Sequence, residues 1–234
     1  MGTLHVVATP IGNLEDITMR ALQVLRTVDV IACEDTRHTQ RLLTHFAIHK
    51  RLIACHAHNE TASAAGIVKL LAEGQDVAFV SDAGTPGISD PGTKVVNAVR
   101  AAGFPVVPIP GVSAVATLIS VSGFVGKSFS FDGFLSPRQG RRRSRLKQLL
   151  DRNEAFMLYE SPFRVVKLLQ DLAELAPQRR VLVGREMTKA FEEYVEGTAD
   201  DLATEFAQRQ SIKGEFALFI SPQEGLPPDE GDDA

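Results

Sequence analysis

The sequence predicts an α/β protein of two domains, the first built around a parallel sheet. Over the first 120 residues, short apolar runs rich in β-branched residues alternate with stretches of helical periodicity. Nearly continuous apolar strands between helices are typical of a parallel sheet covered on both faces. A glycine-containing break at residues 122–127 precedes a second half with apolar runs of its own. We therefore expect one domain at residues 1–121 and another at residues 122–222.

Strands and helices are expected to alternate through the first domain. The expected strands are residues 4–8, 28–33, 52–55, 77–80 and 106–109. The expected helices are residues 18–27, 36–46, 60–72, 93–102 and 112–121. Apolar residues recur on one side of the first of these helices, and Gly74 provides a stop for the third.

The second domain is expected to contain five strands and three helices. The expected strands are residues 129–135, 155–159, 181–185, 191–195 and 216–220. The expected helices are residues 138–150, 162–175 and 199–208. Ser161-Pro162 is a favourable helix start, with Ser as the cap and Pro in the first turn. Thr198, with Asp201 three residues later, predicts another start.

The charge of the chain is unevenly distributed. The formal net charge of −4, from 25 Lys and Arg against 29 Asp and Glu, argues at first against a partner rich in phosphate. Residues 223–234 hold five of these acids and no base, and this Pro- and Gly-rich tail is expected to be disordered. The remaining 24 acids nearly balance the 25 bases, and residues 138–147 carry six bases without an acid. Nucleic-acid binding therefore stays open.

The cysteines, the histidines and the lack of long apolar runs indicate the cellular compartment of the protein and whether it binds a metal. Cys33 and Cys55 end apolar runs without CxxC spacing, so both are expected in the core of a cytoplasmic protein. No run of about 18 uncharged apolar residues predicts a membrane span, and no secretion signal is recognisable.

His56 and His58 look like a metal pair, and Asp82 with Asp90 like a carboxylate pair. No third ligand follows at recognisable spacing, so no metal is expected, and His58 with Asn59 is read as a loop or helix start.

Three glycine- and proline-rich segments, at residues 8–13, 81–92 and 108–114, each lie at the end of an expected strand of the first domain. The carboxyl ends of parallel strands line the ligand crevice of an open α/β sheet. Small residues there let a ligand approach the backbone, whose N–H groups can hold an anionic group. None of the segments is a GxGxxG or Walker A motif, which disfavours dinucleotide and P-loop chemistry. Together they predict a ligand site.

Four short groups each combine acids and bases beside apolar runs. They are EDTR at residues 34–37, ESPFR at 160–164, EMTK at 186–189 and KGE at 213–215. Any one of them reads most simply as a rim ion pair that contributes little stability. Four of them at element ends predict a polar cleft between the two domains.

The segments TPIGNLEDIT, EDTR, SDAGTPGISDPG, PGVSA, GFL, ESPFR, EMTK and KGE, in this order, resemble the tetrapyrrole-methylase superfamily. Within it, the chain is most similar to the branch that 2′-O-methylates a cytidine of bacterial 16S ribosomal RNA. The resemblance implies the two-domain class III methyltransferase fold, with a mainly parallel N-terminal sheet, a mixed C-terminal sheet and S-adenosylmethionine in the cleft between them. It also implies 16S rRNA or the small ribosomal subunit as partner, and a homodimer.

The resemblance assigns residues of both domains to the cofactor. Those in the first domain are Pro10, Ile11, Gly12, Asp82, Ala83, Gly84, Ile88, Ser113 and Ala114. Those in the second domain are Tyr159 and Ala217.

The chemistry of ribose methylation suggests further residues. A ribose hydroxyl is a poor nucleophile, so an acceptor for its proton would assist the transfer. The acids that could accept it, unranked, are Glu34, Asp35, Asp90 and Glu186. The cations that could hold RNA phosphates are Arg37, Arg164 and Lys189, with Arg141, Arg142 and Arg143 of the basic run. A helix starting near Pro137 is expected to place this run on one face.

Two other functions stay open from the sequence. A methylase of a porphyrin or corrin precursor would have an apolar, Arg-poor cleft. A non-catalytic, ribosome-associated RNA-binding protein would keep the fold without binding S-adenosylmethionine. EDTR, ESPFR and the basic run favour RNA methylation.

Overall fold

The computed structural model describes residues 1–56, 59–123 and 128–223. The chain divides into two compact units, Met1–Ala114 and Val115–Ala234, which are described separately below. Helix α5 (Ala114–Ser120) falls with the second unit apart from its first residue, whereas the sequence places it before the domain boundary. The boundary at residues 121–122 stays a prediction. The acidic tail beyond Gln223, expected to be disordered, lies outside the described residues.

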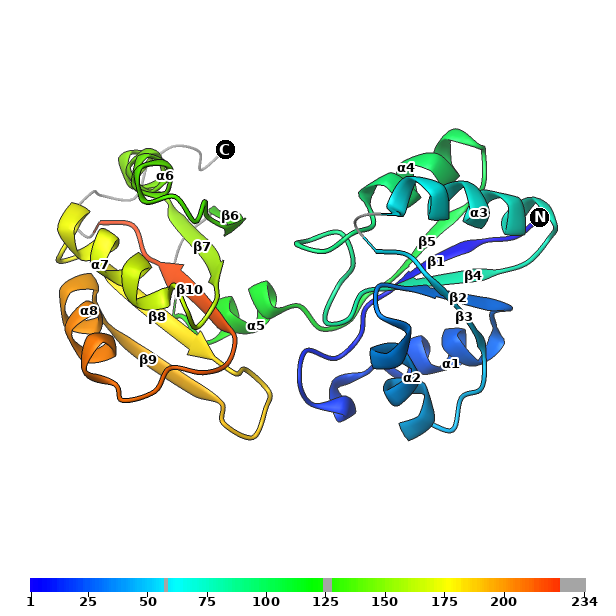
Figure 1. The fold of residues 1–234 in the computed structure, drawn as a ribbon, viewed down its shortest axis with the longest axis horizontal. Helices are drawn as coiled ribbons and strands as arrows, with labels where there is room; N and C mark the ends of the chain where they lie inside the picture. Colours follow the sequence, from blue (N-terminus) through cyan, green and yellow to red (C-terminus); the bar gives the residue numbers. More distant parts are fainter. Residues whose placement is uncertain (57–58, 124–127, 224–234) are drawn as a thin grey trace, which may run out of the picture. The chain divides into compact units, whose positions relative to one another are not determined.

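The first unit is built on a five-stranded parallel sheet with the strand order β3-β2-β4-β1-β5 (Figure 1). Its strands are β1 (Leu4–Val7), β2 (Val30–Cys33), β3 (Arg51–Ala54), β4 (Val77–Val80) and β5 (Val106–Ile109). In the register, Val7 lies opposite both Val80 and Ile109, so β1, β4 and β5 end level with one another. The predicted parallel sheet is confirmed, and the loops that follow these three strands leave the same edge.

Helices cover both faces of this sheet (Figure 1). The helices are α1 (Met19–Thr27), α2 (Thr36–His45), α3 (Glu60–Ala72) and α4 (Thr93–Ala101). Successive residues of β2 enter opposite cores: Val30 and Ala32 pack with α3 and α4, whereas Ile31 and Cys33 pack with α1 and α2. This two-sided burial is the reason that β2 is apolar throughout. Both cysteines are buried and free, as expected of core residues.

The second unit contains a mixed five-stranded sheet with the order β6-β7-β10-β8-β9. Its strands are β6 (Phe129–Phe134), β7 (Ala155–Glu160), β8 (Arg180–Arg185), β9 (Glu193–Thr198) and β10 (Phe216–Ile220). Strands β6 and β7 are parallel, and the other neighbours are antiparallel. The mixed sheet implied by the resemblance is therefore confirmed.

Helices α6 (Gln139–Asp151), α7 (Val165–Leu175) and α8 (Ala199–Gln208) bury one face of this sheet in a single core. Helix α5 also contacts the sheet. Its Leu118 is fully buried, and its Cδ1 atom would lie 2.9 Å from a Cβ atom at Gly184 of β8.

No helix in the described parts of the chain has both the length and the apolar character needed to cross a bilayer.

The structure corrects two element boundaries of the second unit. Helix α7 begins at Val165 and not at Pro162, because Arg164, with φ −128° and ψ −14°, interrupts the helical backbone. The residues before it form a separate turn, in which the Ser161 carbonyl accepts the N–H groups of Arg164 (3.1 Å) and Val165 (3.0 Å). Strand β9 begins at Glu193 and not at residue 191, because the Glu192 N–H bonds to the Lys189 carbonyl (3.1 Å) in another turn. The predicted start of α8 is confirmed: Thr198 Oγ1 accepts the Asp201 N–H at 3.1 Å.

Candidate functional site

The three small-residue loops of the first unit are bonded to one another through their backbones. Thr9, after β1, exchanges two hydrogen bonds with Gly84, after β4, at N–O distances of 2.9 and 3.0 Å. The Thr85 hydroxyl of the same loop donates to the Val112 carbonyl, after β5, at 3.0 Å. Loops distant in sequence therefore form one connected surface at the carboxyl edge of the sheet, where open α/β sheets bind ligands.

Nine of the expected cofactor residues lie on this loop surface or at its end. Pro10 is buried, Asp82 is half-buried, and Gly12 and Ala83 are exposed. Ile88 is 40% exposed, which is high for a large apolar side chain. The remaining four are Ile11, Gly84, Ser113 and Ala114. Their assignment to the cofactor stays a prediction.

Two glycines allow the loops to approach so closely. Gly84 has a φ of +77°, and a Cβ atom there would lie 3.3 Å from Ile11 Cγ2. A Cβ atom at Gly111 would lie 3.0 Å from the Cβ of Ala8. Below them, the buried Thr9 hydroxyl donates to the Ser81 carbonyl at 3.1 Å. The absence of a side chain at Gly84 and Gly111 thus lets the three loops pack closely against one another.

We expect Gly84→Ala to weaken S-adenosylmethionine binding about tenfold. The methyl group strains the left-handed backbone by about 1–2 kcal/mol and presses on Ile11, which displaces the loop that Thr9 holds. Isothermal titration calorimetry measures the affinity. Gly103→Ala is the matched control, because Gly103 has a φ of +79° with nothing within 4 Å of its Cβ position. Equal loss of affinity in both variants would contradict the role of the loop.

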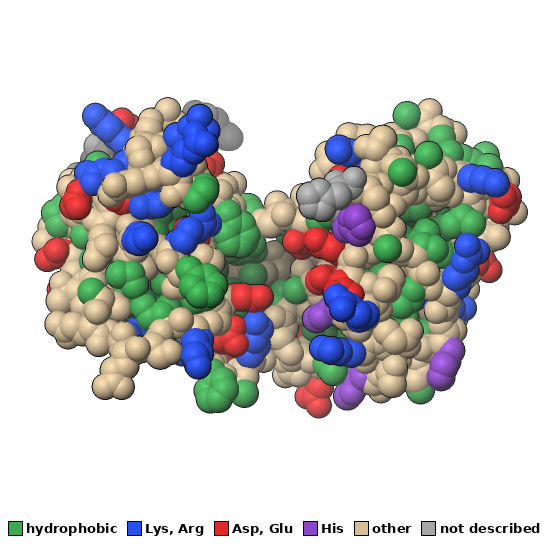
Figure 2. Space-filling view, viewed as in Figure 1, with side chains coloured by type: hydrophobic (Ala, Val, Ile, Leu, Met, Phe, Trp, Pro, Cys, Tyr) green, Lys and Arg blue, Asp and Glu red, His purple; other side chains and the backbone are tan. Residues whose placement is uncertain are grey.

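An acidic group lies on the neighbouring loops after β2 and β4. Asp82 Oδ1 accepts the backbone N–H of Asp35 at 3.0 Å, which ties the two loops together. Partial burial raises the pKa of Glu34, and the negative charges of Asp82 and Asp90 raise it further. Figure 2 shows acidic side chains gathered on this unit. The first unit therefore presents a negatively charged region beside the loop surface.

The four acids predicted as proton acceptors differ in their surroundings. The Asp35 carboxylate caps α2 and pairs with Arg37, whose hydrogen bonds lower the pKa of Asp35 to about 2. Burial acts to raise the pKa of Glu186, but hydrogen bonds from the Glu215 N–H (2.9 Å) and Lys189 (2.9 Å) outweigh it and lower the pKa. Glu34 combines a raised pKa with a carboxylate that accepts no hydrogen bond from the described residues. Asp90 lies near it, on the β4 loop.

Glu60 supports the loop surface and is not evident from the sequence. Its buried carboxylate accepts the N–H groups of Gly92 (2.9 Å) and Lys94 (3.0 Å) at the start of α4. These bonds fix the end of the loop 81–92, where Gly92 has a φ of +147°. Because Glu60 and Gly92 are 32 residues apart, no local motif predicts this contact.

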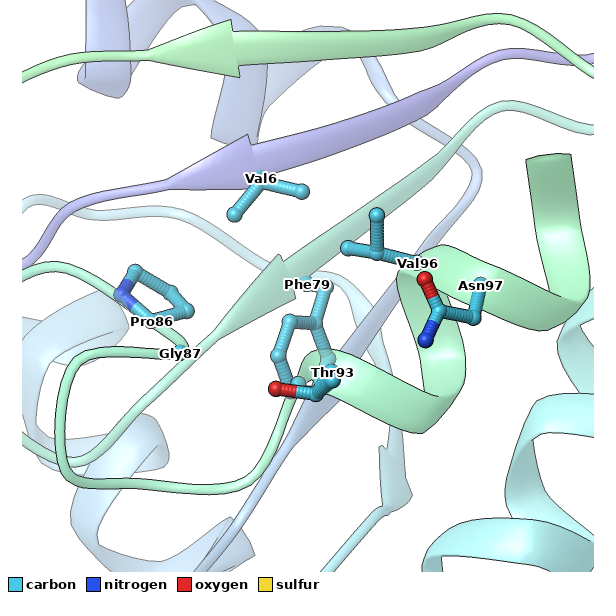
Figure 3. A pocket seen from close by; sticks show the side chains of 8 residues that line it. Val6, Phe79, Pro86, Gly87, Thr93, Val96 and Asn97 are labelled. Carbon is cyan, nitrogen blue, oxygen red and sulfur yellow. The ribbon is translucent and has the colours of Figure 1, made fainter.

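A pocket of about 200 Å³ lies beneath the same loop, on the face of the sheet that α4 covers. Figure 3 shows Val6, Phe79 and Val96 around it, with Pro86 and the other loop residues at one side. Its polar lining side chains are Thr93 and Asn97. The volume is below the roughly 300 Å³ at which pockets for small-molecule ligands begin, so this pocket by itself does not hold a complete nucleoside cofactor.

In the second unit, the two expected cofactor residues lie beside each other. Tyr159 of β7 and Ala217 of β10 are opposite one another in the register. The Tyr159 ring makes edge contacts with Phe131 and Phe134 of β6, with centroid distances of 4.8 and 5.7 Å. The cleft expected between the two domains stays a prediction.

The predicted role of Arg142 in RNA binding is wrong. Arg142 is 3% exposed, and its Nε and Nη2 atoms lie 2.7 and 2.6 Å from Asp171 Oδ2 of α7. Gln139 Nε2 donates to the other carboxylate oxygen at 3.2 Å. Helix α6 therefore does not present its bases on one exposed face, because burying its apolar side turns Arg142 inward with it.

The other predicted RNA-binding cations lie at or near the surface, and most of them are paired. Arg143 bonds to Glu174, Arg164 lies 2.7 Å from Glu160, and Lys189 lies between Glu186 and Glu215 at 2.9 and 2.8 Å. Arg37 pairs with Asp35 at 3.0 Å, although its side chain is 86% exposed. Arg141 is exposed and makes no ion pair with any described residue, and neither does Arg138, which was not singled out from the sequence.

Of the two histidines, the structure describes His56, which lies shortly before α3. The His56 N–H donates to Asn59 Oδ1 at 2.8 Å, and Asn59 is the residue before the helix, as expected for a helix start. His58 lies outside the described residues. Within the described residues, no three His, Cys, Asp or Glu side chains are grouped so that they could hold a metal ion.

A parallel-sheet unit with interlocked loops at its carboxyl edge, followed by a mixed-sheet unit, defines a two-domain α/β protein of the class III methyltransferase type. The sequence pattern of the tetrapyrrole (corrin/porphyrin) methylases matches residues 3–203. The chain belongs to this family. Within it, the chain groups with proteins named ribosomal RNA small subunit methyltransferase I, to which it is 41–48% identical.

Curated relatives cover most of the chain. The Xylella fastidiosa protein of this name is 48% identical over 94% of this chain and 81% of its own. The Borrelia garinii protein is 46% identical over 93% and 98%. The crystal structure of the methyltransferase CobJ matches with a TM-score of 0.73 at 18% identity, over 97% of both chains. Uroporphyrin-III C-methyltransferase from Thermus thermophilus, complexed with S-adenosylhomocysteine, matches with a TM-score of 0.66 at 16% identity, over 93% of this chain and 97% of that one.

The first unit fits S-adenosylmethionine as the cofactor. The loop surface offers close backbone approach at Gly84 and Gly111. The half-buried Asp82 and Glu34 supply negative charge suited to a cationic sulfonium. The observations agree with a methyl donor held at the carboxyl edge of the parallel sheet.

Proposed function

We propose that the chain transfers a methyl group from S-adenosylmethionine to the ribose 2′-oxygen of a cytidine in 16S ribosomal RNA. The observation that carries the proposal is the interlocked loop surface with Glu34 beside it, in a chain whose relatives are named as small-subunit rRNA methyltransferases. Cytidine and its 2′-oxygen are the finer part of this proposal, supported by the sequence resemblance.

When bound, S-adenosylmethionine supplies a methyl group on a positively charged sulfur. The chain's part is mainly positioning, which contributes up to about 7–11 kcal/mol in well-oriented reactions. The backbone bonds between Thr9 and Gly84 and the Glu60 contacts at Gly92 hold the loops before the ligand arrives. Little reorganisation is then needed on binding.

Glu34 is the residue we propose to accept the proton of the ribose hydroxyl. It lies at the end of β2, half-buried, with no hydrogen bond from the described residues to occupy its oxygens. A raised pKa brings a carboxylate closer to the value at which general bases work near neutral pH. Asp35 and Glu186 are less suited, because their carboxylates are bound to Arg37 and Lys189.

We further propose that the protein acts as a homodimer in the cytoplasm. The two buried, unpaired thiols of Cys33 and Cys55 support a reducing compartment. The homodimer is supported by the family resemblance, and equilibrium sedimentation measures it directly.

The experiment is transfer of labelled methyl from S-adenosylmethionine to free 16S rRNA and to small subunits, both from cells that lack the modification. We expect labelled 2′-O-methylcytidine after digestion to nucleosides and chromatography. Uroporphyrinogen III serves as the competing substrate. Methylation of a nucleobase would contradict the ribose assignment, and methylation of uroporphyrinogen without transfer to RNA would contradict the RNA substrate.

A further inference from the structure

Two phenylalanines are exposed where the parallel strands β6 and β7 end. Phe134, the last residue of β6, is 56% exposed, and Phe163, in the turn after β7, is 88% exposed. Phe134 lies opposite Tyr159 in the register. The guanidinium of Arg164 donates to the Leu135 carbonyl at 3.3 Å, which ties the turn to the end of β6. The two rings therefore belong to one edge of the second unit.

The structure holds this edge in place. The buried Glu160 carboxylate accepts the Ser161 N–H and the Arg164 Nε–H, both at 2.7 Å, so the turn that carries Phe163 is anchored on both sides. Phe134 is braced by its edge contact with Tyr159. Large aromatic side chains on such a fixed edge expose apolar surface at a cost, and exposed apolar surface of this kind marks binding sites.

The two segments that carry the rings are basic, and Glu215, which precedes the β10 residue opposite Glu160, is paired with Lys189 at 2.8 Å. Residues 134–141 and 161–170 contain four bases and no acid: Arg138, Arg141, Arg164 and Lys167. The preceding acid, Glu160, has a fully buried side chain that is paired with Arg164. Arg138, Arg141 and Lys167 are exposed and make no ion pair with the described residues. Figure 2 shows Lys and Arg side chains beside apolar ones on this unit.

We propose that this edge, formed by Phe134, Phe163, Arg138 and Arg141, binds unstacked nucleotides of the substrate RNA. Bases stack on the two rings, and the arginines contact the flanking phosphates. The inference rests on the proposed function and adds to it the form of the RNA: single-stranded or locally opened, and not a continuous duplex. In an A-form duplex the bases are stacked on one another, whereas bases of loops and ends are free to stack on aromatic side chains.

The same charges argue against a second copy of the chain as the occupant. A twofold interface places the same patch on both sides, so the bases of one copy would face those of the other. Like charges placed opposite each other across an interface are unfavourable. An RNA strand fits both the positive charge and the exposed aromatic rings of the edge, because its phosphates are anionic and its nucleobases present flat aromatic faces.

The test measures binding of a fluorescent single-stranded oligoribonucleotide and of the duplex with its complement. Wild type is expected to favour the single strand. Phe163→Ala is expected to weaken single-strand binding by about 5- to 150-fold, the usual loss when a stacked aromatic is removed. Phe163→Trp is expected to bind the single strand about as well as wild type, because it keeps an aromatic ring for stacking. Phe163→Leu is expected to bind as weakly as Phe163→Ala, because it has no such ring. Arg138→Gln with Arg141→Gln is expected to reduce the salt dependence by about 1.4 in log–log slope, for two phosphate contacts on a single strand.

Phe191→Ala is the matched control. Phe191 is 74% exposed in the turn between β8 and β9, beside Glu192 and Glu193. These two strands lie at the opposite side of the strand order from β6, although β8 ends level with β7. Its removal is expected to leave RNA binding unchanged. Equal losses in both variants, or unchanged binding in Phe163→Ala, would overturn the proposed edge.

Methyl transfer to rRNA and sedimentation of the protein, measured on the same variants, separate this inference from the proposed function. If wild type methylates rRNA and Phe163→Ala binds RNA as wild type does, the edge is refuted and the methyltransferase assignment stands. If Phe163→Ala changes only the sedimentation of the protein, the edge is a protein contact and the inference fails. If wild type neither binds nor methylates RNA, both fail.

Discussion

Replacing Glu34 with Gln is expected to lower kcat for methyl transfer to RNA by about 100- to 10,000-fold, the usual contribution of a positioned general base. The amide retains the shape of the side chain but cannot accept the proton of the ribose hydroxyl. The affinity for S-adenosylmethionine, measured by calorimetry, is expected to change far less than kcat. Single-turnover transfer of labelled methyl to small-subunit RNA measures the chemical step.

The pH dependence provides a second readout of Glu34. The base must be ionised, so the wild-type rate is expected to rise with pH through the Glu34 pKa, which burial and the charges of Asp82 and Asp90 raise above its ordinary value. Glu34→Gln is expected to lose this rise. Glu73→Gln, an acid near the end of α3 with only a 4.0 Å contact to Lys69, is the control and is expected to keep the wild-type profile.

Stability distinguishes a catalytic loss from a damaged fold. A carboxyl whose pKa is raised on folding disfavours the folded state when it is ionised. Glu34→Gln is therefore expected to unfold at the same or a higher urea concentration at neutral pH. The difference is expected to shrink as pH falls through the raised Glu34 pKa of the folded state and to vanish below the ordinary glutamate pKa of the unfolded chain. Full activity in a folded Glu34→Gln protein would rule out Glu34 as the base.

Replacing Arg142 with Met is expected to lower the free energy of unfolding by about 3–5 kcal/mol. The change leaves the Asp171 carboxylate, 1% exposed, without its main partner between α6 and α7. Gln139 donates one bond and Arg143 lies 3.6 Å from Asp171 Oδ1, which does not replace the two close contacts of Arg142. Urea unfolding followed by circular dichroism measures the change.

Two variants make the Arg142 prediction specific. Arg141→Met changes an exposed arginine on the same helix that makes no ion pair with the described part of the chain, and it is expected to stay within about 0.5 kcal/mol of wild type. Arg142→Met combined with Asp171→Leu removes both charges and is expected to recover much of the loss, because the cost comes from burying an unpaired carboxylate. Loss of RNA affinity in Arg142→Met without any loss of stability would contradict the buried role.

Much of the fold could be predicted because its signals are local. The apolar runs of the first unit are long enough to bury both faces of a strand, and Val30–Cys33 does so with alternate residues. Helix starts at Thr18 and Thr198 depend on one side chain and an N–H three residues later. The start of α7 was wrong because a buried carboxylate, Glu160, holds the turn that Ser161-Pro162 would otherwise open as a helix.

The site could be predicted only in part, because its loops have local sequence signals but the contacts between them do not. Short glycine- and proline-rich segments after strands identify loops, and a parallel sheet brings such loops to one edge. Their bonds to one another, the Glu60 contact with Gly92 and the surroundings of Glu34 all join residues far apart in the chain. No spacing rule contains them, because each depends on which strands become neighbours.

The sequence by itself determined the α/β class, the parallel first sheet, the three loops and the presence of a concentrated basic segment, because all of these follow from local composition and periodicity. Only the tertiary structure decided how that basic segment is used. Packing of α6 against α7 buries Arg142 with Asp171 and leaves Arg138 and Arg141 exposed near Phe134 and Phe163. The sequence gives the charge of each side chain, but whether that charge can contact a ligand depends on the residues that the folded chain packs beside it.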